Sequence, residues 1–246
     1  MYHFFTEPEL IGEKTVSLVG SDVNHIRNVL RMRPGEEIRV CTGRDSLDYR
    51  CRIETITETQ VTAEILWVED SRAELASKIC LYQALPKSDK MEQIIQKAVE
   101  LGAFRIIPME TKRCVMKLRS GKEEAKIRRW NAISESAAKQ SKRMIIPEVA
   151  GVLSFEEALK EAAALDLLCI PYERADGMDR TREWLAGIKP GQSVGILIGP
   201  EGGFEAAEVE KAREAGAAVI SLGRRILRTE TAGMALIAAM MLQLDN

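Results

Sequence analysis

The chain has 246 residues and a formal net charge of −2, and 46% of its residues are hydrophobic and 29% charged. This is the composition of a globular protein with one large core or two smaller ones. No apolar run reaches the roughly 18 residues of a membrane-spanning helix. Residues 1–10 do not have the pattern of a signal peptide. The five cysteines are scattered without a CxxC pair and there are two histidines, so we expect a cytoplasmic protein with reduced thiols, no metal centre and no membrane anchor.

The first 70 residues have the alternating pattern of β-strands. Apolar and polar residues alternate over 49–53 and again over 61–67. Turn residues at Pro34-Gly35 and Thr42-Gly43 separate such segments. Short alternating strands between tight turns predict a small antiparallel barrel or sandwich. The pattern breaks at a linker over 69–78, so the sequence predicts one domain at 1–72 and a second at 73–246.

From residue 79 onward, apolar strands alternate with amphipathic helices. A helix is predicted within 88–102, with Ser88 or Asp89 at its N-cap and Gly102 just past its end. Ser154 and Glu157 form a predicted capping box at the start of another helix. Such strands with helices between them indicate an α/β domain with a mostly parallel sheet, covered on both faces. The predicted strands lie at 79–85, 104–108, 165–173, 194–199 and 217–223.

The strand at 194–199 runs into a loop with glycines at 199, 202 and 203. It is not a P-loop, because no Gly-Lys-Ser/Thr follows, and Glu205 and Glu208 would repel a phosphate at the start of the next helix. Glycines without β-carbons let a flat ligand lie against backbone N–H and C=O groups. A purely structural Gly-Gly turn has the same sequence, so the loop alone leaves both interpretations open.

The strand at 217–223 also ends in a glycine-containing loop, 223–231. The carboxyl ends of parallel strands meet at one edge of a sheet, where open α/β sheets bind ligands. We therefore expect the two loops to form one ligand site. Thr229 or Thr231 is expected to cap the last helix, 229–244, whose apolar surface predicts burial in the core or against another subunit.

Four segments resemble one family of RNA-modifying enzymes. "LPKSDKMEQIIQKAVELG" (85–102), "IGPEGGF" (198–204) and "LGRRILRTETA" (222–232) resemble the SPOUT-class RNA methyltransferases. "NHIRNVLRMRPGEEIRV" (24–40) resembles the PUA-like RNA-binding barrel of the SPOUT enzymes that methylate N3 of a uridine in 16S ribosomal RNA. The resemblance extends along the whole chain.

The resemblance implies a SPOUT-type mostly parallel sheet with a C-terminal trefoil knot, preceded by a small PUA-like β-barrel. It also implies that S-adenosyl-L-methionine (SAM) binds in the knot, that the protein is a homodimer, and that 16S rRNA or the 30S subunit is its partner. The cofactor-binding residues that the resemblance implies are Pro171, Ile198, Gly199, Pro200, Glu201, Gly202, Leu222, Gly223, Ile226, Leu227 and Arg228.

Removal of the uracil N3 proton requires a cation near the developing negative charge and a proton acceptor. Arg228 is the candidate cation, unless it forms a salt bridge to Glu201 or Glu230. Glu201 and Glu230 are the candidate acceptors, unless their carboxylates satisfy loop backbone amides. We place Arg228 and Glu201 as the candidate catalytic residues.

Two segments are rich in basic residues. Residues 24–52 contain seven arginines against four acidic residues, and 105–143 contain twelve lysines and arginines against four acidic residues. These two basic segments indicate a localised polyanion-binding surface, although a solvated helix with ion pairs has the same composition. The candidate RNA-binding residues are His25, Arg27, Arg31, Lys87 and Arg143.

Two other functions account for part of the sequence. A non-catalytic RNA-binding module would explain the basic segments and the apolar last helix, but it gives no reason for two glycine loops at one edge of a sheet. A SPOUT methyltransferase that acts on another RNA, such as tRNA, would share both loops. The barrel motif and "KRMIIP" (142–147) favour ribosomal RNA through resemblance alone.

Overall fold

The computed structural model describes residues 1–116, 121, 123–175 and 177–244. The chain divides into two compact units: residues 1–74 with 138–146, and residues 75–137 with 147–246. Segment 138–146, which the sequence assigns to the second domain, makes its contacts in the first unit. The division into two domains with separate roles stays a prediction.

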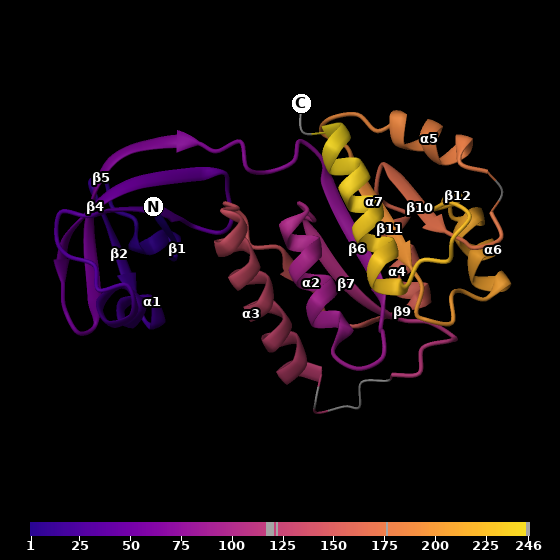
Figure 1. The fold of residues 1–246 in the computed structure, drawn as a ribbon, viewed down its shortest axis with the longest axis horizontal. Helices are drawn as coiled ribbons and strands as arrows, with labels where there is room; N and C mark the ends of the chain where they lie inside the picture. Colours follow the sequence, from indigo (N-terminus) through magenta and orange to yellow (C-terminus); the bar gives the residue numbers. More distant parts are fainter. Residues whose placement is uncertain (117–120, 122, 176, 245–246) are drawn as a thin grey trace. The chain divides into compact units, whose positions relative to one another are not determined.

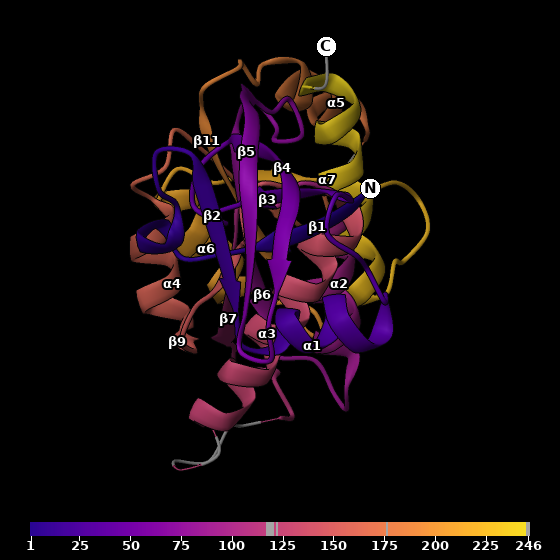
Figure 2. The same ribbon diagram turned by 90° about the vertical axis from the view of Figure 1, so that its left-hand side faces the viewer.

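The first unit is built on a five-stranded sheet with the strand order β1-β3-β4-β5-β2 (Figure 2). The prediction of a small antiparallel barrel or sandwich is wrong for β1, which runs parallel to β3, whereas the other neighbouring strands of this sheet are antiparallel. Parallel neighbours need a crossover connection, which the period-two pattern does not reveal. The elements are β1 (Tyr2–Phe5), η1 (Pro8–Leu10), β2 (Thr15–Val19), α1 (Ser21–Asn24), η2 (His25–Val29), β3 (Glu37–Cys41), β4 (Leu47–Ile56) and β5 (Gln60–Asp70).

Alternation along these strands separates an apolar core from a charged face. The strand register places His3 beside Arg39, Arg39 beside Arg50, and Arg50 beside Trp67, so these side chains share the face away from the core. The core contains apolar side chains from all five strands: Phe4, Val16, Leu18, Ile38, Val40, Cys51, Ile53, Val61 and Ala63.

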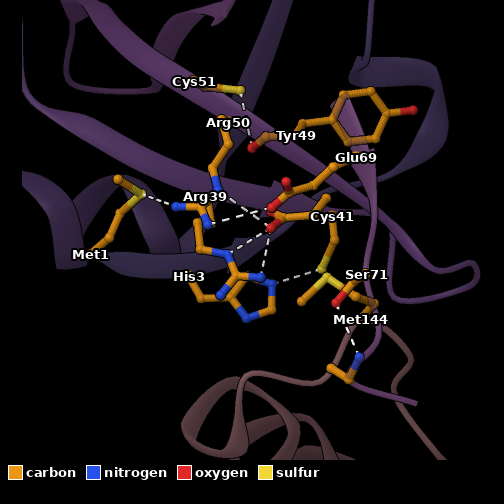
Figure 3. Close-up of polar contacts among 12 residues, drawn as sticks. Met1, His3, Arg39, Cys41, Tyr49, Arg50, Cys51, Glu69, Ser71 and Met144 are labelled. Carbon is orange, nitrogen blue, oxygen red and sulfur yellow. Dashed lines mark hydrogen bonds and ion pairs between the residues drawn. The ribbon is translucent and has the colours of Figure 1, made fainter. Parts of the chain in front are cut away.

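The buried carboxylate of Asp48 belongs to this charged face and contacts Arg39 and Arg50, which Figure 3 labels. Arg39 contacts Asp48 Oδ2 through Nε at 2.8 Å and Nη2 at 2.6 Å, and Arg50 Nε lies 3.4 Å from the same oxygen. His3 Nε2 lies 2.9 Å from Cys41 Sγ. Burial, and then the charge of Arg39, lowers the pKa of His3 to about 4, and burial raises the pKa of Cys41 to about 12. Both side chains are therefore neutral at pH 7.

The second unit is an α/β domain in which every strand pairing is parallel. The sheet order is β12-β10-β11-β6-β7-β8, and β9 also pairs with β7 (Figure 1). The strands are β6 (Lys78–Ala84), β7 (Arg105–Glu110), β8 (Glu148–Val149), β9 (Leu153–Ser154), β10 (Leu167–Pro171), β11 (Ser193–Ile198) and β12 (Ala218–Ile220). The helices are α2 (Lys90–Glu100), α3 (Glu123–Ser141), α4 (Phe155–Ala162), α5 (Asp179–Ala186), α6 (Ala206–Glu214) and α7 (Thr229–Leu244).

Helices cover both faces of this sheet, as predicted. Tyr82 donates a hydrogen bond to Glu161 just before the end of α4 (3.1 Å), whereas the next residue, Gln83, donates one to Thr229 of α7 (2.9 Å). Successive side chains of a strand point to opposite faces, so α4 and α7 lie on opposite sides of β6. The predicted capping box of Ser154 and Glu157 is present at the start of α4.

The last helix crosses the middle of the sheet. β12 is an edge strand, yet the chain returns from it to pack α7 against β11, β6 and α2 (Figure 1). This course is the one expected of a knotted C-terminal segment. None of the helices in the described ranges is long and apolar enough to cross a membrane.

Candidate active site

The ends of three parallel strands enclose a cavity of about 460 Å³ in the second unit. Its walls are residues 171–173 at the end of β10, 198–204 at the end of β11 and 221–229 after β12, with Lys90 and Ala232 completing the lining. The structure therefore brings together the two glycine loops, as their positions after parallel strands predict. All eleven predicted cofactor-binding residues line this cavity: Pro171, Ile198, Gly199, Pro200, Glu201, Gly202, Leu222, Gly223, Ile226, Leu227 and Arg228.

The first loop is shaped by its glycines. A β-carbon on Gly199 would lie 3.1 Å from the buried ring of Phe204, a distance that forces the ring or the loop to move. Gly203 has a φ of +66° and donates a backbone hydrogen bond to Pro200 (2.9 Å), a conformation that favours glycine. Arg113 Nη1 holds the loop from outside by donating to the carbonyl of Gly202 (2.8 Å).

The second loop is anchored at its base and exposed at its tip. Ser221 exchanges hydrogen bonds with Thr181 of α5, through its carbonyl at 2.7 Å and its amide at 3.2 Å. Gly223 has a φ of +99°. Ile226 is 88% exposed, which is unusual for a large apolar side chain. The tip therefore offers apolar surface to a ligand in the cavity.

Thr229 connects the two loops through a buried polar contact. Its hydroxyl donates to the carbonyl of Gly199 (2.6 Å) and accepts from Gln83 Nε2 (2.9 Å). The prediction that Thr229 or Thr231 caps the last helix is wrong, because α7 begins at Thr229 and neither threonine precedes it. Sequence reasoning also missed Gln83, because a polar residue inside an apolar strand gives no signal of its partner.

Lys90 sits between two acidic side chains at the cavity. Its Nζ lies 3.2 Å from Glu201 Oε1 and 3.2 Å from Glu230 Oε2. The backbone amide of Lys87 also donates to Glu201 Oε1 (3.0 Å). The alternative salt bridges of Arg228 are thus not formed, and Arg228 makes no ion pair with any residue in the described ranges. Sequence reasoning missed Lys90, which occupies the first turn of a helix far from both loops in the chain.

These contacts determine whether the carboxyl group of Glu201 is ionised. Burial by itself would raise the pKa of Glu201, but hydrogen bonds from its own amide and that of Lys87, together with Lys90, outweigh burial and lower it. The hydrogen bond to Glu201 is the largest cause that raises the pKa of Lys90. Glu201 is therefore an ionised, hydrogen-bonded carboxylate, which is a weak proton acceptor.

The N-terminus of α6 is occupied by acidic side chains, as its sequence indicates. Glu205 and Glu208 form a capping box there. Glu208 is buried and accepts a hydrogen bond from the amide of Lys112 (2.9 Å). These carboxylates take the place that a phosphate group would occupy at this helix end. Within the described ranges, no cluster of histidine, cysteine and acidic residues could hold a metal ion.

The candidate RNA-binding residues fall into two groups. His25, Arg27 and Arg31 are exposed on and after η2, and Arg27 makes an exposed ion pair with Glu58 (3.4 Å). Lys87 is exposed beside the cavity, where its amide binds Glu201. Lys117, Arg119 and Lys122 of the second basic segment lie outside the described residues.

Arg143 is not available for RNA in this structure, contrary to the prediction. It is only 3% exposed, and its guanidinium binds the carboxylate of Glu74, with Nε 3.1 Å from Oε2. The amides of Met144 and Ile145 donate to the same carboxylate at 3.0 and 3.2 Å. Arg143 therefore holds segment 138–146 in the first unit, and we leave it out of the RNA-binding surface.

Comparisons with known proteins agree with this arrangement. A family model described as an RNA methyltransferase domain matches residues 73–241, and one described as an RNA methyltransferase PUA domain matches residues 18–66. The ribosomal RNA small subunit methyltransferase E of Bacillus subtilis is 36% identical over 98% of this chain and 94% of its own length. The chain belongs to the ribosomal RNA small subunit methyltransferase E family. The resemblance found in the sequence is thus confirmed, and so is the fold class.

Two solved structures of similar proteins contain the expected cofactor. The ribosomal RNA small subunit methyltransferase E of Neisseria gonorrhoeae, bound to SAM, has a TM-score of 0.85 and 33% identity, covering 99% of this chain and 98% of its own. A Legionella pneumophila methyltransferase in complex with SAM has a TM-score of 0.85 and 30% identity, covering 98% and 97%. The cavity fits such a ligand, because it combines apolar walls at Ile198, Leu222 and Leu227 with backbone groups of the glycine loops.

Proposed function

We propose that this chain transfers the methyl group of SAM to N3 of a uridine in 16S ribosomal RNA. The observation that carries the proposal is the single cavity formed by both glycine loops, in a chain of this family. In this proposal residues 73–246 bind the cofactor, catalyse the reaction and dimerise, and residues 1–72, completed by 138–146, bind RNA. The methyl group of bound SAM is already activated, so the main task of the protein is to position the two reactants.

Each wall of the cavity has a distinct part in this positioning. Ile198, Leu222 and Leu227 supply an apolar slot for adenine, and the amides and carbonyls between Gly199 and Gly202 supply polar contacts to its edge. Pro171 closes the third side. No diphosphate is present in SAM, which agrees with a loop that lacks phosphate-binding features.

Arg228 is the proposed catalytic cation. Its side chain lines the cavity, is exposed and has no acidic partner among the described residues, so its charge is available to a substrate. The uracil N3–H loses its proton as the methyl group is transferred, and a guanidinium beside O2 or O4 stabilises the negative charge. Glu201, the proposed proton acceptor from the sequence, is poorly suited to that step because its pKa is lowered.

N3 lies on the Watson–Crick edge, so the target base must be unpaired or flipped out of a helix. Binding then depends on contacts to the backbone of the surrounding RNA. We assign these contacts to His25, Arg27 and Arg31 in the first unit and to Lys87 beside the cavity. Such contacts release counterions, and RNA binding should therefore weaken steeply with added salt.

The partner that we propose for the last helix is a second copy of this chain. Helix α7 is apolar along its length, and Leu242 near its end is 75% exposed. An apolar helix surface that the chain itself does not cover is typical of a subunit interface.

A ribosomal RNA substrate and five free cysteines fit a cytoplasmic location.

The test is methyl transfer from radiolabelled SAM to 30S subunits, naked 16S rRNA and tRNA, followed by mapping of the modified base. The proposal expects label at N3 of one uridine in 16S rRNA. Label in tRNA alone would favour a methyltransferase with another substrate. No transfer to any RNA, together with retained RNA binding, would favour the non-catalytic RNA-binding module.

A further inference from the structure

Three separate segments of the second unit meet at the ammonium group of Lys90. Lys90 belongs to the first turn of α2, Glu201 to the glycine loop after β11, and Glu230 to the first turn of α7. Both carboxylates are 3.2 Å from the same nitrogen. One side chain therefore ties the loop that lines the cavity to two helices of the domain.

Because this cluster is partly buried, the positive charge of Lys90 is important for the two carboxylates. The side chain of Lys90 is 30% exposed, and those of Glu201 and Glu230 are 27% and 13% exposed. Solvent therefore screens the charges less than at the open surface. The two carboxylates share one nitrogen, so without Lys90 they would face each other as like charges. Glu230 has no other ion pair with a described residue, so Lys90 is the cation that faces its buried Oε2.

We infer that Lys90 is a positioning residue of the cofactor site, which holds the loop 199–203 in its ligand-binding conformation before the ligand arrives. This inference rests on the proposed function, since it takes the cavity to be the SAM site. Lys90 carries out this role through Glu201, whose second anchor is the amide of Lys87. A loop that is already ordered loses less conformational entropy when the ligand binds, so its affinity is higher.

The test is calorimetric titration of SAM into the full-length protein and the variant Lys90→Met, which keeps the length of the side chain but removes its charge. We expect SAM to bind about tenfold more weakly to this variant, the size of a partly buried charge coupling. The matched control is Lys97→Met on the same helix, because Lys97 pairs with Glu100 and does not line the cavity. It should leave the affinity for SAM unchanged.

The double variant Lys90→Met/Glu201→Gln separates positioning from simple damage. The change Glu201→Gln removes one of the two like charges, and the new amide oxygen can still accept the hydrogen bond from Lys87, so most of the lost affinity should return. The inference is wrong if Lys90→Met binds SAM as tightly as the wild type. It is also wrong if the loss of SAM-binding free energy in the double variant equals the sum of the losses in Lys90→Met and in Glu201→Gln. If the wild type itself binds no SAM, the proposed function fails instead.

Discussion

The hydroxyl of Thr229 lies 2.6 Å from the carbonyl oxygen of Gly199, so the first residue of the last helix is bonded to the end of β11. This bond fixes the direction of a short chain of hydrogen bonds. Because Thr229 donates to Gly199, it must accept from Gln83, whose amide also donates to Ala84. The carbonyl of Gly199 is thereby engaged within the protein, and it helps to hold the first glycine loop against the last helix.

Replacing Thr229 by valine should destabilise the protein and weaken SAM binding. The change keeps the shape of the side chain but leaves the partly buried carbonyl of Gly199 and the buried amide of Gln83 without this partner, and an unpaired buried polar group costs about 1–3 kcal/mol. Chemical denaturation and calorimetric titration measure the two effects. Thr229→Ser, which retains the hydroxyl, should behave like the wild type; equal effects from serine and valine would argue against the hydrogen bond.

Replacing Arg228 by alanine should slow methyl transfer far more than it weakens cofactor binding. Removal of one electrostatic donor from a transition state lowers the turnover rate by about 100-fold or more. Single-turnover methylation and SAM titration measure the two quantities separately. Arg182→Ala, an exposed arginine paired with Asp179 on α5, is the control. Near-normal turnover of Arg228→Ala would show that another group supplies the charge.

Arg31 and Arg143 should respond differently to alanine substitution, although the sequence assigns both to RNA. Loss of a phosphate contact by the exposed Arg31 should reduce the salt slope of RNA binding by about one. Arg143→Ala instead leaves the largely buried carboxylate of Glu74 without its cation, a change that costs about 3–5 kcal/mol at buried sites. Filter binding at several salt concentrations and thermal unfolding distinguish the two. A normal melting temperature for Arg143→Ala would contradict the structural role.

The stability of the protein should fall as pH drops from about 6.5 to about 4, partly through His3. Its pKa in the folded protein is about 4, against 6.5 when unfolded, so the unfolded chain binds the proton first and folding weakens across this interval. The loss amounts to at most about 3 kcal/mol. His3→Gln should remove this part of the pH dependence of the unfolding free energy, and the exposed His25→Gln should not. If the unfolding free energy of His3→Gln depends on pH in the same way as that of the wild type, His3 does not make this contribution.

Much of the second unit could be predicted from the sequence because its signals are local. Apolar strands and the capping box of Ser154 depend on neighbouring residues, and the order of strands and helices places both glycine loops at one edge. Lys90, Gln83 and Glu74 act through partners that are distant in the chain, and no periodicity indicates such pairs. Arg143 shows that a local signal can also mislead. A basic residue in a basic segment gives the same sequence pattern whether its side chain contacts RNA or a buried carboxylate.

Segment 138–146 has a consequence for how the polypeptide is made. The amide of Ile146 donates to Gly43 (2.9 Å), and Glu74 is held by Arg143 and by two amides that follow it. The N-terminal unit therefore becomes complete only after residue 146 has left the ribosome, when much of the next unit has already been synthesised. During translation, the first unit therefore cannot finish folding before synthesis of the second unit has begun. A fragment that ends at residue 74 would lack segment 138–146, which is part of the first unit.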